Sequence, residues 1–270
     1  MKNIFKNFYC DYVFLLSKNI NFINKIIFLF DKYIYLFLLI FRLRLTVKLF
    51  GKKYLSGDKY GLLSFQIMLK DFYDYYFIFS LNNPVIFDVG GHVGNFALAA
   101  SVIYKNSKTY VFEPILNTYN LLSENTGQYQ NIEIYNLAIG DNNASCRMYF
   151  ADNELDRSSF IKNNILKQEN IKFQEVTMTK LSSFVFEHNI PKIDLLKIDV
   201  EGFEVEVLKG SVEILDRIKN IIIEVHVDKD GKRLMDLFNI FYNFGFRVVR
   251  FGKIWQDNEV RCFDIILEKI

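Results

Sequence analysis

The stretch that decides the fold is Phe87-Asp88-Val89-Gly90-Gly91-His92-Val93-Gly94-Asn95, which we call the glycine loop. It lies where the apolar run Val85–Val89, which predicts a buried strand, gives way to a helical pattern over Asn95–Tyr104. Glycines at such a junction let the backbone turn sharply and admit a ligand close to the main chain. Because ligands of open α/β sheets bind beyond the carboxyl ends of strands, we expect the loop to bind one.

Short apolar runs typical of strands alternate with helical patterns from about residue 84 onward. This alternation predicts an open, mainly parallel α/β sheet with helices on both faces. Beyond the glycine loop, the expected strands are Thr109–Phe112, Ile132–Ala138, Ile193–Val200, Ile221–Val227, Phe246–Phe251 and Cys262–Leu267, and the expected helices are Leu116–Asn125, Val205–Asp216 and Arg233–Asn243.

Two segments depart from this alternation. The segment Gly252–Asn258 is turn-like and too short for a crossover helix, so we expect the last two strands to pair antiparallel. Between Gly140 and Pro191 the pattern shows only short strands, at Arg147–Phe150 and Glu175–Met178. We interpret residues 142–190 as an insertion near the substrate side.

Composition limits the possible functions. The chain has 270 residues, 51% hydrophobic content and a net charge of +2, which suit one globular domain with an appendage and give no basic excess for binding nucleic acid. Cys10, Cys146 and Cys262 are far apart and form no CxxC pair, so we expect neither disulfides nor a metal site. A reducing cytoplasm is the simplest setting.

Residues 1–50 are rich in Phe, Ile, Leu and Tyr, and we expect residues 1–80 to form a mainly helical extension to a catalytic domain over 81–270. The densest apolar part is too short and too charged to span a membrane. Two interpretations stay open: helices that cover the core, and an interfacial helix at the inner face of the membrane. The basic residues that would meet anionic lipid are Lys25, Arg42, Arg44, Lys48, Lys52 and Lys53.

The spacing D-x-G-x-x-x-G in the glycine loop differs from the G-x-G-x-x-G of dinucleotide binders. If the ligand carries a cationic amino-acid group, the carboxylate of Asp88 would face that group. Alternatively, Asp88 would organise the loop around the ligand. Glu113, followed by Pro114, ends the next expected strand, where an acidic side chain can accept hydrogen bonds from ribose hydroxyls. Glu113 therefore supports a ligand that contains adenosine, but it does not distinguish NAD from other cofactors that contain adenosine.

Further polar residues follow the later strands. Asp141 either reaches an adenine edge or simply occupies a turn after Gly140. Alternation places Lys197 and Asp199 on one face of a strand. With Glu201 and Glu204 they form a cluster of charged side chains. Gathering these charges costs free energy unless the cluster binds a ligand or its members form ion pairs with one another at the start of a helix.

Two histidines lie near these groups. Glu224 and His226 share one face of the next strand, and His226 is either a general base or a structural histidine. His92, inside the glycine loop, is expected to shape the cofactor pocket.

Together these segments resemble the FkbM family of S-adenosylmethionine-dependent methyltransferases. The resemblance covers about residues 84–267, and its most specific piece is Lys197–Gly210. The segments that carry it are the glycine loop, Phe112-Glu113-Pro114, Asn136-Leu137-Ala138-Ile139-Gly140-Asp141, Leu196-Lys197-Ile198-Asp199-Val200-Glu201-Gly202-Phe203-Glu204 and Ile223-Glu224-Val225-His226.

The resemblance implies a seven-stranded Rossmann-like methyltransferase sheet, S-adenosylmethionine as cofactor, and methylation of a hydroxyl, typically in surface polysaccharides, glycolipids or secondary metabolites. It places Glu113 at the ribose and Asp141 near the adenine. With the residues argued above, the expected cofactor-binding set is Asp88, Gly90, Gly91, His92, Gly94, Asn95, Glu113, Pro114 and Asp141, and the expected catalytic set is Lys197, Asp199, Glu201 and His226.

The expected reaction is in-line attack of an acceptor hydroxyl on the methyl group, driven by alignment and water exclusion, with Asp199 or His226 as base. The acceptor is a small molecule or glycan, contacted by residues 142–190 and 51–80. Two rival functions are a nicotinamide-dependent oxidoreductase and a scaffold that keeps the fold without catalysis.

Overall fold

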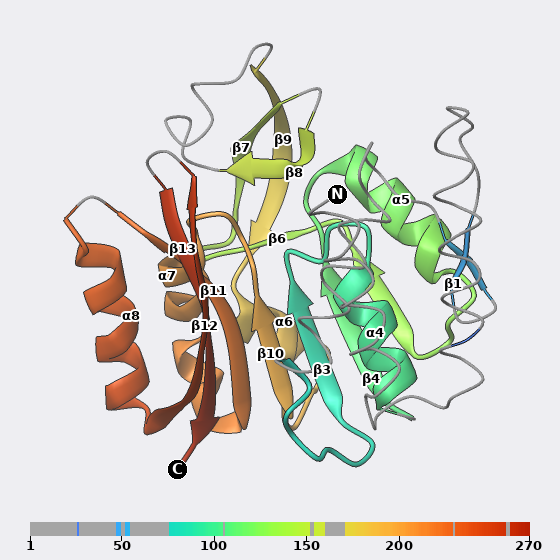
Figure 1. The fold of residues 1–270 in the computed structure, drawn as a ribbon. Helices are drawn as coiled ribbons and strands as arrows, with labels where there is room; N and C mark the ends of the chain where they lie inside the picture. Colours follow the sequence, from blue (N-terminus) through green and yellow to red (C-terminus); the bar gives the residue numbers. More distant parts are fainter. Residues whose placement is uncertain are drawn as a thin grey trace, which may run out of the picture.

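The computed structural model describes residues 26, 47–49, 52–54, 76–104, 106–151, 154–159, 171–228, 230–257 and 260–270. Its centre is a seven-stranded sheet in the order β12-β13-β11-β10-β3-β4-β5 (Figure 1). The five strands from β11 to β5 are parallel, and β13 and β12 are antiparallel to their neighbours. The strands are β3 (Val85–Val89), β4 (Lys108–Phe112), β5 (Ile132–Tyr135), β10 (Leu195–Ile198), β11 (Asn220–Val227), β12 (Phe246–Asp257) and β13 (Val260–Lys269).

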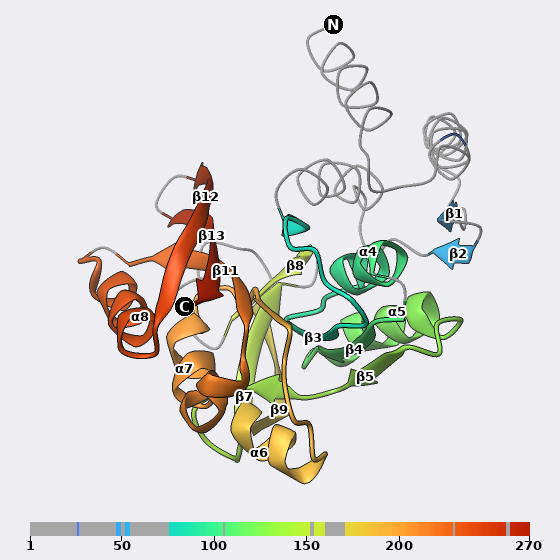
Figure 2. The ribbon, with the colours of Figure 1, turned by 90° about the horizontal axis from the view of Figure 1, so that it is seen from below.

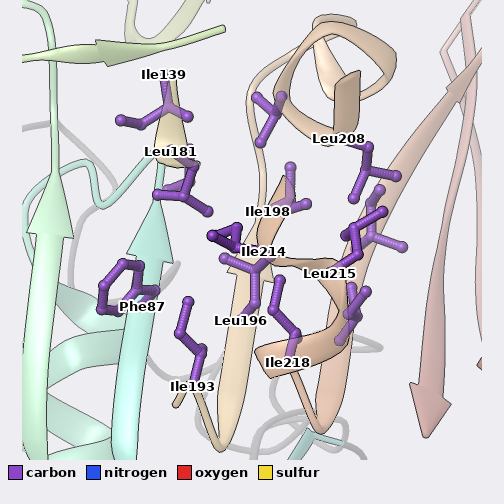
Figure 3. Close-up of a cluster of buried hydrophobic side chains, with 14 of the residues drawn as sticks. Phe87, Ile139, Leu181, Ile193, Leu196, Ile198, Leu208, Ile214, Leu215 and Ile218 are labelled. Atoms are coloured by element: carbon purple, nitrogen blue, oxygen red, sulfur yellow. The ribbon is translucent and has the colours of Figure 1, made fainter. Parts of the chain in front are cut away.

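Helices cover both faces of this sheet, as Figure 2 shows from below. The helices α4 (Asn95–Ile103) and α5 (Leu116–Thr126) lie on one face, where Ile86, Phe96 and Leu122 are buried together. The other face carries α6 (Leu181–Glu187), α7 (Glu204–Lys209), the 3₁₀ helix η3 (Val212–Arg217) and α8 (Lys232–Asn243). Its core is drawn in Figure 3, where Phe87, Leu196 and Ile198 meet side chains from α6, α7 and η3.

This arrangement explains the apolar sequence of the central strands. Along β11, Ile221, Ile223 and Val225 belong to the same core as Phe87 and Leu196, whereas Ile222 belongs to the opposite core. A strand buried on both faces needs apolar residues at every position, as the sequence of parallel strands predicts. The buried polar residues Lys197 on β10 and Asp264 on β13, and the half-buried Glu224 and His226 on β11, lie toward the edge where the parallel strands end, which is the edge that binds ligands in such sheets.

A second, four-stranded sheet has the order β6-β9-β7-β8 and rises beyond the carboxyl edge of the large sheet (Figure 1). It consists of β6 (Ala138–Ile139), β7 (Ala144–Ala151), β8 (Glu154–Ser159) and β9 (Ile171–Thr179). The sequence predicted two short strands here; the structure adds β8 and the helix α6.

Three element predictions were wrong in detail. The expected strand Ile132–Ala138 splits into β5 and β6, because the chain bends at Asn136, whose side-chain amide donates to the carbonyls of Glu113 and Pro114. The expected helix Val205–Asp216 breaks at Gly210, where a Cβ would lie 1.9 Å from the carbonyl oxygen of Gly140. The expected turn Gly252–Asn258 is mostly strand, since β12 continues to Asp257 through two register shifts.

The remaining strands and helices of the alternating pattern are confirmed, including the antiparallel final pair. Most of the predicted helical extension over residues 1–80 lies outside the described residues, as does the possible membrane contact of residues 1–50. The described part of that extension includes two short antiparallel strands, β1 (Val47–Leu49) and β2 (Lys52–Tyr54). Within the described residues, no helix is long and apolar enough to cross a membrane.

Candidate functional site

The glycine loop is clamped between the ends of two neighbouring strands. The backbone N–H groups of Gly90 and Gly91 both donate to the carbonyl oxygen of Phe112, each at 3.0 Å. On the other side, a Cβ at Gly90 would lie 1.8 Å from the carbonyl oxygen of Asp199. Gly90 also has φ of +82°, a left-handed backbone that residues with a side chain adopt at a cost. Sequence and geometry agree that only glycine fits here.

The same loop passes directly into α4. Gly94 has φ of +95°, and a Cβ there would lie 2.9 Å from the side chain of Leu122 on α5. Asn125, also on α5, donates its side-chain amide to the carbonyl of Val93 at 2.8 Å. Asn95 is the first residue of α4 and is buried. The helix N-terminus is therefore held rigidly behind the loop.

Glu113, directly after β4, hydrogen-bonds to the glycine loop through its side-chain carboxylate. One carboxylate oxygen accepts from the N–H of His92 at 3.0 Å and the other from the N–H of Ile115 at 2.9 Å. Burial raises the pKa of Glu113 to about 7, although both N–H groups lower it. Each oxygen keeps a second lone pair, so the carboxylate can organise the loop and still accept another donor.

Pro114 and the turn after it connect the loop region to the small sheet. The carbonyl of Pro114 accepts from the side-chain amides of Asn136 at 2.9 Å and Gln174 at 3.2 Å. Gln174 lies on β9, and its amide oxygen also accepts from the N–H of Leu116 at 3.2 Å. The insertion is thus docked beside the end of β4. Asn136 and Gln174 had no predicted role.

A buried ion-pair triad underlies the loop. Lys197 on β10 lies directly opposite Asp88 on β3, and its Nζ is 3.3 Å from Asp88 Oδ1 and 3.2 Å from Asp199 Oδ2. The ammonium group also lies 5.6 Å from the centre of the Phe96 ring. Burial alone would lower the pKa of Lys197, but Asp199 and Asp88 raise it above its usual value, so the lysine stays charged.

The carboxylate of Asp88 is only partly compensated. It is fully buried, and burial raises its pKa while Lys197 lowers it. The backbone N–H of Ala97 also lowers its pKa, and the contact with Lys197 Nζ is 3.3 Å long. Oδ2 lies under the loop, 3.6 Å from where a Cβ of Gly91 would be. A buried carboxylate with unused acceptor capacity can hold a cationic donor.

Farther along the same edge lies a second group of polar side chains, which we call the β11–β13 cluster: Glu201, Glu204, Glu224, His226 and Cys262. His226 is paired with Cys262, and Glu224 with Asp264, across the antiparallel strands. His226 Nδ1 lies 2.8 Å from Glu204 Oε1, and its Nε2 lies 3.2 Å from Glu201 Oε2 and 3.6 Å from Glu224 Oε1. Three carboxylates therefore surround one imidazole.

The cluster shifts the ionisation of its members. Burial alone would lower the pKa of His226, but Glu201 and Glu204 raise it to about 12. Burial, with the charge of Asp199, raises the pKa of Glu224 well above its usual range. Glu201 also has φ of +51°, an uncommon backbone for a residue with a side chain and one that gathers at functional sites.

Tyr76 and Asp264 close this end of the site. The Tyr76 hydroxyl donates to Asp264 Oδ2 at 2.7 Å, and burial with the Asp264 charge raises the pKa of Tyr76. Neither residue was predicted, nor was Cys262. All three join the site through strand pairing or a contact 188 positions apart, for which no local sequence signal exists.

Most predicted residues meet at this edge, but Asp141 lies apart. It is exposed and follows Gly140, whose carbonyl packs against Gly210 at the end of α7. The adenine contact of Asp141 stays a prediction, and Asn136 lies directly beside Glu113.

Comparison with known proteins agrees with this geometry. The family model described as "Methyltransferase FkbM domain" matches residues 88–248, which begin at Asp88 and include every predicted site residue. The match covers more than half of the chain.

The curated relatives match this chain over only part of their own length. A hexuronic acid methyltransferase from Haloferax volcanii is 28% identical over 157 residues, which are 58% of this chain and 62% of that protein. A 2-O-methyltransferase from Sinorhizobium fredii is 26% identical over 53% of this chain and 63% of its own length. The chain thus matches less than two thirds of either protein. A 31-O-demethyl-FK506 methyltransferase from Streptomyces tacrolimicus is 28% identical over 61% of this chain and 73% of its length.

Solved structures are more distant. A precorrin-6y C5,15-methyltransferase from Geobacter metallireducens has a TM-score of 0.42 and 12% identity, covering 71% of this chain and 82% of its own. An rRNA methylase from Streptococcus thermophilus has a TM-score of 0.42 and 14% identity, covering 70% and 89%. The fold is established by the strand order and by the family match.

Proposed function

The chain belongs to the FkbM methyltransferase family, and on that premise we propose that it transfers a methyl group from S-adenosylmethionine to a sugar hydroxyl in a surface polysaccharide, a glycolipid or a related metabolite. The observation that carries this proposal is that Asp88, Glu113, Lys197 and Asp199 come from the ends of three strands, β3, β4 and β10, and meet around one glycine loop. The relatives named for hexuronic acid and 2-O-methylation support a sugar acceptor.

The residues around the loop fit the cofactor. Gly90 and Gly91 let the loop backbone pack closely against Asp199 and Val111, and the buried carboxylate of Asp88 suits the cationic amino-acid end. Glu113 keeps lone pairs for ribose hydroxyls while it holds the N–H of His92. Gly94 and Asn95 begin the helix behind this pocket, and Pro114 fixes its edge. We assign the adenine side to the neighbourhood of Asn136 in place of Asp141.

Bound S-adenosylmethionine supplies a methyl group on a positively charged sulfur, so the leaving group is neutral and needs no acid. The protein's part is to align the acceptor hydroxyl, exclude water and accept its proton. Asp199 suits the role of base because its side chain is partly exposed beside the loop, with Lys197 Nζ 3.2 Å away to position it. Glu201, two residues after Asp199 in the turn that follows β10, would face the acceptor.

His226 is a poor base in this arrangement. Both ring nitrogens face carboxylates, which keep the imidazole protonated at neutral pH when no other cation is present. A proton held this firmly is not exchanged with a hydroxyl of the acceptor. We therefore propose Asp199 alone as the base and treat His226 as a positioning group.

Two measurements test this function. Calorimetry should give binding of S-adenosylmethionine and no binding of NAD; the reverse would favour an oxidoreductase. Incubation with labelled S-adenosylmethionine and hexuronate-containing glycans, followed by mass spectrometry, should give products one methyl group heavier. Tight cofactor binding with no methylated glycan, lipid or metabolite in cell extracts would favour the scaffold alternative.

A further inference from the structure

The β11–β13 cluster contains metal ligands that the proposed methyl transfer does not use. One ligand atom each from Glu224, His226 and Cys262 lies within 4.8 Å of the other two. These residues come from two strands of the rigid central sheet, with His226 directly opposite Cys262. We propose that Glu224, His226 and Cys262 form a binding site for a divalent ion with the ligand preference of zinc.

The distances between the three ligand atoms suit a tetrahedral ion if one ligand moves slightly inward. Zinc lies about 2.0–2.3 Å from nitrogen, oxygen and sulfur ligands, so neighbouring ligand atoms are about 3.3–3.8 Å apart. His226 Nε2 and Glu224 Oε1 already lie 3.6 Å apart. Moving the thiol of Cys262 inward by about 1 Å, which a side-chain rotation allows, would complete the set.

The histidine is oriented as a metal ligand should be. Its Nδ1 is 2.8 Å from the buried carboxylate of Glu204, and this leaves Nε2 directed at Glu224. Metal-binding histidines nearly always donate their other ring N–H to such an outer carboxylate, which fixes the tautomer. Glu204 itself is fixed by the N–H of Gly202 at 2.8 Å.

The charge balance also favours a cation. Glu201, Glu204 and Glu224 surround a single imidazole, while Lys197 is engaged by Asp88 and Asp199, and Asp264 by Tyr76. Several partly buried carboxylates with one cation are costly. A divalent ion replaces the protons of His226 and Cys262 and offsets the charge. Imidazole and thiolate select zinc-like ions, whereas magnesium and calcium prefer oxygen ligands throughout.

Three protein ligands leave one position of a tetrahedral ion open, as in catalytic zinc sites. Glu201 Oε2, 3.2 Å from His226 Nε2, either fills it or yields it to another oxygen. The site lies on the same sheet face as Asp199, so the ion would bind a hydroxyl or carboxylate of the acceptor. This last step alone rests on the proposed function; metal binding does not.

The test is metal content and affinity of the full chain. Purified protein should hold about one zinc per chain, and cobalt added after chelation should produce an absorption band from thiolate coordination. Cys262→Ser should abolish that band and weaken metal binding at least about tenfold. Cys146→Ser, which changes a half-buried cysteine in the small sheet, should do neither.

A second readout keeps the test valid if Cys262→Ser folds poorly. In the wild-type protein, zinc should protect Cys262 from alkylation while Cys146 reacts at the same rate with and without metal. Glu204→Gln should weaken zinc binding about tenfold, because it replaces the charged acceptor that fixes the imidazole by a neutral amide. Substoichiometric zinc, no thiolate band and no protection would overturn the site. Calorimetry with S-adenosylmethionine on metal-free protein tests the methyltransferase proposal separately.

Discussion

The two halves of the site are built differently. Around the glycine loop, backbone groups meet backbone groups or a single carboxylate, as in the two N–H bonds to the carbonyl of Phe112. In the β11–β13 cluster, side chains meet side chains, as His226 does with Glu201 and Glu204. In a site built from backbone contacts, the close packing admits only one residue type at each position that forms the contacts. In a site built from side chains, the set of residues depends on which strands are neighbours in the sheet. A bound cation can displace protons from such side chains and so change their charges.

The largest expected effect comes from breaking the ion-pair triad under the glycine loop. Lys197→Met leaves Asp88 buried without its ion-pair partner, so we expect a loss of about 3–5 kcal/mol in the free energy of unfolding. Lys192→Met is the matched control, because Lys192 forms an exposed pair with Asp194 and should change stability by less than about 0.5 kcal/mol. Urea unfolding measures both. Equal losses would contradict a special role for Lys197.

Gly90→Ala tests the backbone-built half. The added Cβ would overlap the Asp199 carbonyl and hold a left-handed φ, so we expect a cost of about 2–5 kcal/mol and loss of cofactor binding. Gly245→Ala separates the two causes: its φ is +67°, but nothing lies within 4 Å of the new atom. It should cost only about 1–2 kcal/mol. Similar values for both variants would mean that the close approach at Gly90 is unimportant.

Glu113 gives this half a pH dependence. Burial raises its pKa from 4.5 to about 7, so between these values the folded protein binds more protons than the unfolded chain. Stability from this group is therefore highest at low pH and falls as pH rises through the window, by about 3 kcal/mol. Glu113→Gln removes the slope. Urea midpoints from pH 4.5 to 8 should show wild type losing stability relative to the variant, and parallel curves would contradict the assignment.

The smallest expected effect concerns the docking of the insertion. Gln174→Ala removes two hydrogen bonds at 3.2 Å to the turn after β4, and we expect a loss of about 1 kcal/mol and faster amide exchange at Leu116. Glu175→Ala, whose contact with Arg147 is exposed and 3.9 Å long, should leave exchange at Leu116 unchanged. Unaltered exchange in Gln174→Ala would mean that other contacts dock the insertion.

The two halves also differ in how far the sequence reveals them. The glycine loop, Glu113 and the strand–helix alternation could be predicted because turn geometry and burial demand particular residues at short, fixed spacing. Cys262 and Tyr76 could not, because they reach the site through strand pairing and a long-range contact. The bend at Asn136, which sends the chain into another sheet before Asp141, had no signal in the sequence either, and the adenine contact of Asp141 stays a prediction.

The most direct test of the central claim separates cofactor binding from methyl transfer in two isosteric variants. Asp88→Asn removes the carboxylate under the loop and should weaken S-adenosylmethionine binding about tenfold to a hundredfold in calorimetry. Asp199→Asn should bind the cofactor nearly as wild type does but transfer the methyl group about 10²–10⁴ times more slowly. Full turnover in Asp199→Asn, or unchanged cofactor affinity in Asp88→Asn, would contradict this account of the site.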